Sequence, residues 1–420
     1  MDPLVIATGV FVVCYAVIIS ERVHKTVVAL LGGALVIVLK ILDQEQAFEA
    51  VDFNVIFLLA GMMILANILA KTGVFQWLAI RSAKMARGRP FWILVLLSTL
   101  TLVLSALLDN VTTVVLIAPV TLLLASVLQM DPRPLLLAEI MASNIGGTAT
   151  LIGDPPNILI GSAASLDFGA FLANLAPVVL LIFPVFLALA WFLFRSQLCV
   201  TEEAREAVMN LDEDEVLTDR GLLTKGLLVL FLTMVGFLFH GPLGYEPATV
   251  ALLGASLLML VGKQDPHEAL REVEWSTLFF FVGLFILVGA VVHVGLIKLL
   301  AQAALDLSGQ NHGLTAILIL WMSALLSGII DNIPYTASMI PLVRELGDYM
   351  PVEPLWWSLA LGACLGGNLT AIAASANVTV VHLAERSGYP ISFREFFLPG
   401  ALVTFVSILI STFYIWFRYL

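Results

Sequence analysis

The chain has 420 residues, of which 60% are hydrophobic and 12% are charged, and its formal net charge is −11. A mean hydropathy of +1.02 excludes a water-soluble globular fold, so the composition predicts an all-α polytopic membrane protein. The acidic excess lies mainly in 202–219, which we interpret as a solvated linker segment without a role in binding.

Ten apolar runs are long enough to cross a bilayer, which takes about 20 helical residues, with some shorter. The first run has no basic flank and no cleavage site, so we expect a retained helix and not a signal peptide. The predicted crossings are 3–20, 26–42, 53–70, 135–160, 172–194, 224–240, 247–263, 275–293, 355–381 and 396–417.

Two further apolar stretches, 91–128 and 313–346, are interrupted in the middle by Asp109-Asn110 and by Asp331-Asn332. We interpret each stretch as a re-entrant hairpin of two half-depth helices with the polar pair at its tip. The alternative is two full crossings joined by an aqueous turn, but it leaves no loop residues around either pair.

The two hairpins belong to a gap-free internal repeat, in which residues 28–120 correspond to residues 250–342 at an offset of 222. A duplicated apolar unit with a carboxylate at the same place in each copy is typical of secondary transporters. The predicted organisation is a first transmembrane helix (1–25), a first inverted repeat (26–195), an acidic cytoplasmic linker (196–223), a connecting transmembrane helix (224–246) and a second inverted repeat (247–420).

The distribution of Lys and Arg predicts the orientation, because these residues collect on the cytoplasmic side of a membrane. With both termini outside, all but four of them fall inside; the exceptions are Lys40, Lys298, Arg344 and Arg418. Run 26–42 then crosses outward and its partner 247–263 crosses inward, so the repeats are inverted and the hairpin tips meet near the middle of the membrane. We expect a multi-pass protein of the bacterial inner (plasma) membrane.

A second signature follows each hairpin, from Asn144 to Asn157 and from Cys364 to Asn377, at an offset of 220. Both segments contain a glycine pair, and the first also contains Pro155-Pro156, so neither continues as a regular helix. We therefore predict two broken helices, whose free backbone groups line a cavity or bind a ligand. The alternative explanation of the glycines is close helix packing.

Three aspartates carry the candidate chemistry: Asp109, Asp154 and Asp331. A carboxylate at the centre of a membrane helix costs about 2.5–3.5 kcal/mol on insertion scales, and no Lys or Arg lies in the same segments as Asp109 or Asp331. Binding of a proton or a cation is the expected compensation, which makes these aspartates candidates for proton coupling. The alternative is that each aspartate only caps a hairpin helix.

Other polar residues in the apolar runs are weaker candidates. We interpret His240, His293 and His382 as packing or interface residues, and Cys364 as a small hydrophobe. Glu139 is expected near the membrane boundary. Neither a nucleophile with its base nor a metal motif is present, so the chain is not expected to be an enzyme and no cofactor is expected.

The two hairpin motifs and the two broken-helix motifs resemble those of the ion transporter superfamily, and within it the arsenite permease, NhaD and P-protein branch. This resemblance implies an inverted-repeat fold with a scaffold part and a moving transport part. It also implies a site between the tips and the breaks. The corresponding residues are Asp109, Asn110, Thr112, Asp331 and Asn332 at the tips, and Asn144, Thr148, Asp154, Asn157, Asn368, Thr370, Ser375 and Asn377 at the breaks.

The sequence departs from the dicarboxylate-transporting relatives, whose tips resemble Ser-Asn-Thr, because each tip has an aspartate in place of the serine. A carboxylate at each tip disfavours a dianionic substrate. The expected function is arsenite or antimonite efflux by proton antiport, with Asp109 and Asp331 carrying the protons. A sodium/proton antiporter is the alternative, and an anion or chloride transporter of the P-protein type comes third.

The expected partners are the lipid bilayer, a small inorganic solute (arsenite, antimonite or Na⁺) and protons. The resemblance further implies a homodimer and a soluble ATPase partner, and no nucleic acid.

Overall fold

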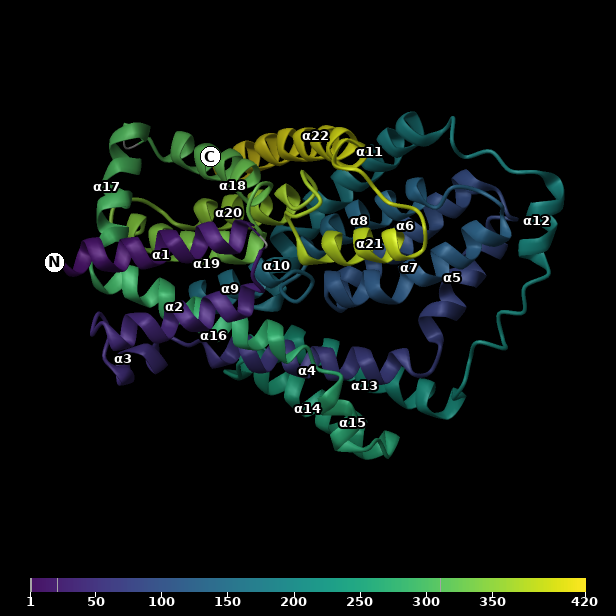
Figure 1. Ribbon diagram of the computed structural model, residues 1–420, viewed down its shortest axis with the longest axis horizontal. Helices are drawn as coiled ribbons and strands as arrows, with labels where there is room; N and C mark the ends of the chain where they lie inside the picture. The colour runs from purple at the N-terminus through teal and green to yellow at the C-terminus, as the bar shows by residue number, and fades with distance from the viewer. Residues whose placement is uncertain (1, 21, 310) are drawn as a thin grey trace.

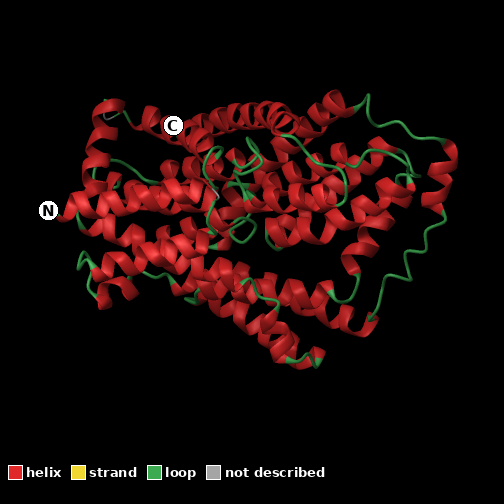
Figure 2. Ribbon diagram, viewed as in Figure 1, coloured by secondary structure: helices red, strands yellow, loops and turns green. Residues whose placement is uncertain are grey.

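The computed structural model describes residues 2–20, 22–309 and 311–420. Figure 2 shows helices joined by loops, and this part of the chain contains no strand. The expected all-α fold is therefore confirmed. Long apolar runs can satisfy their backbone groups inside a membrane only as helices or closed barrels, and here they form helices.

The helices of the first half precede an acidic linker that contains one short helix, α12 (Glu202–Met209). They are α1 (Pro3–Ser20), α2 (Lys25–Val38), α3 (Gln44–Glu49), α4 (Phe53–Ala70), α5 (Val74–Met85), α6 (Pro90–Leu107), α7 (Asn110–Val127), α8 (Arg133–Gly147), α9 (Pro155–Ala164), α10 (Phe168–Asn174) and α11 (Ala176–Phe194).

The second half follows the linker and repeats this order, except that, within the described residues, no separate helix corresponds to α10. Its helices are α13 (Arg220–Leu243), α14 (Pro247–Gly262), α15 (Pro266–Arg271), α16 (Trp275–His293), α17 (Leu296–Ser308), α18 (His312–Ser327), α19 (Asn332–Leu346), α20 (Glu353–Gly366), α21 (Ser375–Arg386) and α22 (Phe393–Tyr419).

The internal repeat is visible in the helix boundaries. Helices α3 and α15 begin and end 222 residues apart, and each begins after an aspartate, Asp43 or Asp265, that accepts a backbone N–H of the first turn. Packing crosses between the repeats: α2 packs against α16, and α4 packs against α14. Helices α1 and α13 take matching places beside these pairs, α1 against α2 and α13 against α14.

The two hairpins, α6–α7 and α18–α19, enter from opposite ends of the molecule's longest axis (Figure 1). Each hairpin packs on the first part of its own broken helix, α6 on α8 and α18 on α20. The second parts cross over, because α9 packs against α19 and α21 packs against α7. Both repeats therefore contribute to a common centre, as an inverted repeat requires.

The arms of the first hairpin are longer than the half-depth helices that we expected. Helices α6 and α7 have 18 residues each, because only the polar pair at the tip interrupts the apolar run. At 1.5 Å per residue, each arm is about 27 Å long. The arms of the second hairpin are shorter, at 16 and 15 residues.

Within the described residues, 8 helices are long and apolar enough to cross a membrane, or up to 9 if α9 and α10 count as one bent span. Both arms of the first hairpin are among the 8, whereas α2 and α14 are too short for that criterion. The expected number of ten crossings therefore stays a prediction.

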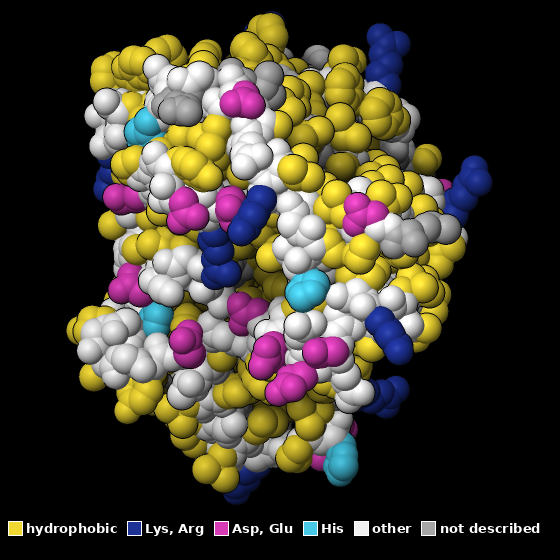
Figure 3. Space-filling model, turned by 90° about the vertical axis from the view of Figure 1, so that its left-hand side faces the viewer, with side chains coloured by type: hydrophobic (Ala, Val, Ile, Leu, Met, Phe, Trp, Pro, Cys, Tyr) yellow, Lys and Arg dark blue, Asp and Glu magenta, His cyan; other side chains and the backbone are white. Residues whose placement is uncertain are grey.

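The ends of the molecule differ in the elements that they carry. The N-terminus, α3 and α17 lie at one end of the longest axis, and α5 and α12 lie at the other (Figure 1). Figure 3 looks onto the first of these ends, where charged and polar side chains are scattered across the middle and hydrophobic side chains reach the edges. This distribution suits a face that meets water inside an apolar belt.

Candidate functional site

The hairpin-tip aspartates begin the second arm of each hairpin. The Asp109 carboxylate accepts the backbone N–H of Thr112 at 2.9 Å, and the Asp331 carboxylate accepts that of Ile333 at 3.0 Å. Both aspartates therefore have the capping role that the sequence left open. Asp109 is 6% exposed, and the Asp331 side chain is 14% exposed.

The tips converge on a third carboxylate, that of Asp154, which is fully buried at the start of α9. Asn110 of the first tip donates its Nδ2 to Asp154 Oδ1 at 3.1 Å. Asn332 of the second tip donates its Nδ2 toward both carboxylate oxygens at 3.4 Å. The residue of the second repeat that corresponds to Asp154 is Ala374, so this central carboxylate is present once.

The two breaks are linked across the repeats by side-chain hydrogen bonds. Asn144 donates its Nδ2 to Asn377 Oδ1 at 3.0 Å, and it also reaches Asn368 Oδ1 at 2.9 Å. Cys364 donates its thiol to Asn157 Oδ1 at 3.4 Å. Because Cys364 corresponds to Asn144 and Asn377 corresponds to Asn157, the same contact is made twice, once in each direction.

Asn157 and Asn377 also stabilise the broken backbone of their own repeats. Asn157 Nδ2 donates to the carbonyl oxygens of Thr148 at 3.1 Å and Thr150 at 2.8 Å. Asn377 Nδ2 donates to those of Gly367 at 2.7 Å and Thr370 at 2.9 Å. These carbonyls lie where the regular helices end, so each asparagine supplies donors at a break that would otherwise be costly inside a membrane.

Three predicted threonines contact the backbone or a neighbouring aspartate. The Thr148 hydroxyl donates to the Asn144 carbonyl at 2.7 Å, and the Thr370 hydroxyl donates to the Gly328 carbonyl at 2.6 Å. Thr112 contacts Asp109 through its backbone N–H. The hydroxyl protons of Thr148 and Thr370 are thus already used to hold the breaks in place.

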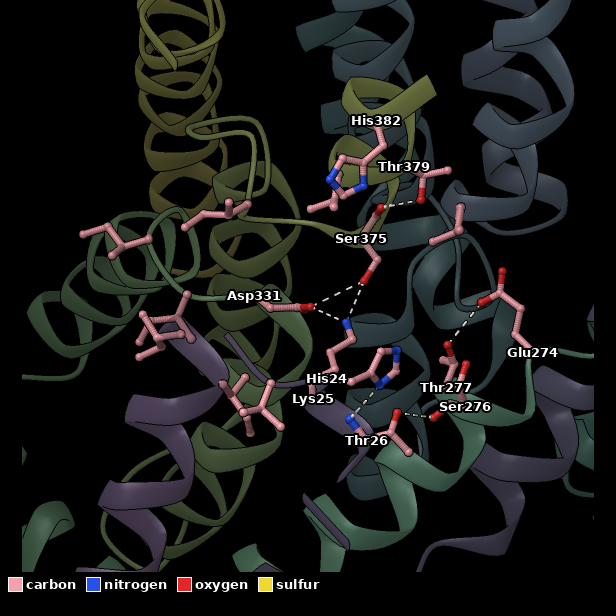
Figure 4. A pocket seen from close by; sticks show the side chains of 18 residues that line it. His24, Lys25, Thr26, Glu274, Ser276, Thr277, Asp331, Ser375, Thr379 and His382 are labelled. Atoms are coloured by element: carbon pink, nitrogen blue, oxygen red, sulfur yellow. Dashed lines mark hydrogen bonds and ion pairs between the residues drawn. The ribbon is translucent and has the colours of Figure 1, made fainter. Parts of the chain in front are cut away.

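A cavity of about 420 Å³ reaches the hairpin tips from one side. It lies between the α1–α2 turn, the start of α16 and helix α21, and its lining includes Val111 of the first tip and Asp331 of the second. Ser375, at the start of α21, also faces it (Figure 4). The cavity therefore reaches residues of both hairpin tips.

Lys25 stands in this cavity and contradicts the expectation that Asp331 must be neutralised by a proton or a bound cation. Its Nζ lies 2.6 Å from Asp331 Oδ2 and 2.8 Å from Ser375 Oγ (Figure 4). The sequence missed it because Lys25 is 306 residues from Asp331 and begins an apolar run, where it looks like a boundary lysine. Among the described residues that line the cavity, it is the only Lys or Arg.

Two further polar residues of the interior were not predicted as site residues. Tyr15 of α1 donates its hydroxyl to the Pro334 carbonyl at 2.8 Å, and this contact holds the second tip against α1. Glu139 is 2% exposed inside α8, and it accepts the Thr121 hydroxyl. Among the described residues, no group of His, Cys, Asp and Glu side chains could hold a metal ion.

The sequence model described as "Citrate transporter" (CitMHS) matches residues 15–362 of the chain. An uncharacterized transporter of Mycobacterium bovis is 50% identical over 425 residues, covering 99% of this chain and 98% of that protein. The human P protein is 35% identical over 500 residues, covering 98% of this chain and 59% of that protein.

Among solved structures, the YdaH transporter of Alcanivorax borkumensis has the same fold, with a TM-score of 0.60, 13% identity and coverage of 99% of this chain and 98% of that one. These similarities agree with the resemblance to the ion transporter superfamily and its P-protein branch. Proteins of this kind are membrane transporters, which are not enzymes. The chain therefore belongs to the citrate transporter family.

Proposed function

We propose that this transporter exports arsenite or antimonite by proton antiport, with Asp109 and Asp331 as proton-coupling carboxylates. The observation that carries the proposal is the convergence of Asn110 and Asn332 on the buried carboxylate of Asp154. One polar centre is thus touched by both hairpins, so movement of either hairpin changes the surroundings of the same charge.

The charges around the centre support an uncharged or cationic solute. Three carboxylates, from Asp109, Asp154 and Asp331, gather there, and Lys25 is already engaged with Asp331. The family description names citrate, but several negative charges on one substrate would be repelled by this set of side chains. Arsenite is an uncharged trihydroxide at neutral pH, and it would bind through amide, hydroxyl and backbone groups.

Proton coupling at Asp109 is supported by the lack of a basic partner in the described part of the chain, which Asp154 lacks as well, whereas Asp331 would bind its proton when its ion pair with Lys25 opens. Within the described residues, no basic side chain forms an ion pair with Asp109 or Asp154. A carboxylate buried in this way is stabilised when it binds a proton or a cation and destabilised when it loses one. Entry of water from either face would then change the proton occupancy, as an antiporter requires.

A sodium/proton antiporter is the second candidate, because the side-chain oxygen of Asn110 is available as a ligand at the centre. Asn110 Oδ1 is buried and has no hydrogen-bond partner in the part of the chain that the structure describes, while its Nδ2 faces Asp154. An amide oxygen beside a carboxylate is a suitable ligand pair for a hard cation. The third candidate, an anion pathway of the P-protein type, rests on likeness to P protein alone.

Several finer expectations remain part of this proposal. They are the cytoplasmic position of the linker, both termini outside, movement of the transport part in an elevator fashion, a homodimer and a soluble ATPase partner.

Dissipation of a pH gradient in proteoliposomes tests the proposal. Arsenite alone should trigger proton movement in the native protein, and Asp109→Asn should lower the rate at least tenfold. Glu139→Gln is the matched control, because it alters another buried carboxylate away from the centre and should leave transport intact. A response to Na⁺ or Li⁺ but not to arsenite would reject metalloid export and favour the second candidate.

A further inference from the structure

The molecule contains a second cavity, of about 430 Å³, that corresponds to the Lys25 cavity in the other repeat. The offsets of 222 and 220 residues relate their linings position by position. Glu246, Pro247, Asp52, Asn54 and Ser162 line the second cavity, and the corresponding His24, Lys25, Glu274, Ser276 and His382 line the first.

The described lining of the second cavity does not include the hairpin tips, and hydrogen bonds join the start of α4 to α9 within it. Ser162 of α9 donates its hydroxyl to Asp52 Oδ2 at 2.5 Å. Asn54 Nδ2 adds a contact to Ser162 Oγ at 3.4 Å, and Asn54 Oδ1 accepts the backbone N–H of Ala248 at 3.0 Å. Neither Asp109 nor the start of α9 is among the described residues that line this cavity.

The corresponding contact in the Lys25 cavity is open. The carboxylate of Glu274 accepts the hydroxyl of Thr277 on its own helix at 3.1 Å, and no hydrogen bond joins Glu274 to His382 among the described residues. Both residues line the cavity, and their side chains lie apart from each other (Figure 4). The contact between equivalent positions is thus formed in the second cavity, between Asp52 and Ser162, and is not formed in the first, between Glu274 and His382.

We propose that Glu274 and His382 form the closing contact of the Lys25 cavity when the transporter faces the opposite side of the membrane. Two inverted copies of one unit exchange their conformations when access alternates. After this exchange, Glu274 and His382 would be hydrogen-bonded to each other, as Asp52 and Ser162 are in the present structure. A glutamate and an imidazole have longer reach than the aspartate and hydroxyl that they replace, and an imidazole N–H is a good donor to a carboxylate.

This inference depends on the chain being a transporter, but not on which solute it carries. It also predicts that the Asp52–Ser162 contact breaks when the Glu274–His382 contact forms. The two contacts are therefore alternatives, and each marks one end state.

A metal bridge provides the test. Glu274→His places a second imidazole opposite His382, so that Ni²⁺ can join α16 to α21 through two nitrogen ligands. Thr379→Cys, in the same cavity, reports access to a membrane-impermeant maleimide, and Cys199→Ser removes the exposed native thiol. Ni²⁺ should slow modification of this reporter at least tenfold and should stop transport.

The matched control is the same protein with His382→Gln, which lacks one ligand and should not respond to Ni²⁺. A second control, Asp52→His with Ser162→His, should trap the present state: Ni²⁺ should stop transport while the reporter keeps its original rate. Equal rates with and without Ni²⁺ in the Glu274→His protein would overturn the inference.

A cysteine pair replaces the metal bridge if Glu274→His does not reach the membrane. Glu274→Cys with His382→Cys, joined by a short cleavable cross-linker in the Cys199→Ser background, should stop transport until the linker is cleaved. Failure of this pair to cross-link during turnover would also overturn the inference, and neither result depends on the solute.

Discussion

Lys25 and Asp331 form an ion pair of 2.6 Å between the start of α2 and the tip of the second hairpin. The residue of the first repeat that corresponds to Asp331 is Asp109. The residue of the second repeat that corresponds to Lys25 is Pro247, which carries no charge. The two halves therefore share a backbone plan but differ in how their tip aspartates are compensated. This difference makes the pair a sensitive place to test stability and transport separately.

Lys25→Met should destabilise the protein, because it leaves the largely buried Asp331 carboxylate without its cation. The expected loss is about 1–3 kcal/mol, less than for a fully buried pair because the Lys25 side chain is 26% exposed. Adding Asp331→Asn should restore most of the thermal stability in detergent but not the transport. Additive losses in the double variant would mean that the two side chains do not interact.

Asn110→Ala and Asn332→Ala should impair transport to a similar extent, at least tenfold each, because each removes one of the amide donors to Asp154. Initial rates in proteoliposomes measure this effect, and melting in detergent checks that the fold is intact. Thr224→Ala is a suitable control, since this exposed hydroxyl donates to the Arg220 carbonyl of its own helix, α13. A defect in only one of the two asparagine variants would contradict a shared role.

Gly61→Ala should destabilise the packing of α4 against α14. A Cβ at Gly61 would lie 2.8 Å from the Ala251 backbone carbon, which cannot move away cheaply. The expected cost is about 1–3 kcal/mol, typical of overpacking. Gly9→Ala is the matched control, because a Cβ there meets nothing within 4 Å. Yield and melting temperature in detergent measure the difference, and equal values would reject close packing at Gly61.

Glu213 should hold the linker at neutral pH through its ion pairs with Lys84 and Arg81 on α5. The hydrogen bond from Lys84 is the main cause that lowers the pKa of Glu213 from 4.5 to about 2. A lowered pKa in the folded state means that the stabilisation is complete above pH 4.5 and is lost as the pH falls toward about 2.

Proteolysis of the linker measures this attachment. Cleavage within 196–219 should accelerate over that acidic range, and Glu213→Gln should accelerate it at pH 7, whereas Glu215→Gln should not. Identical cleavage rates for the two variants at pH 7 would contradict an anchoring role for Glu213.

The hairpins and breaks could be predicted because their signals are local. The polar pair at Asp109-Asn110 interrupts an apolar run, and Pro155-Pro156 cannot continue a helix, so each position specifies a break by its own chemistry. The repeat could be predicted because equivalent residues keep a constant spacing, and its inversion could be predicted from the uneven distribution of Lys and Arg between the two sides of the membrane. The helices begin and end close to these predicted points.

The pairing of the charges could not be predicted. Nothing in the segment around Lys25 indicates that its ammonium group lies beside Asp331, and nothing near Ser162 indicates a bond to Asp52. The sequence by itself determined that this is a duplicated membrane protein with broken helices and acidic hairpin tips, because hydropathy, spacing and helix breakers act locally. Only the tertiary structure decided which carboxylate meets both tips and which is paired with a lysine, because those contacts depend on how two inverted halves pack together.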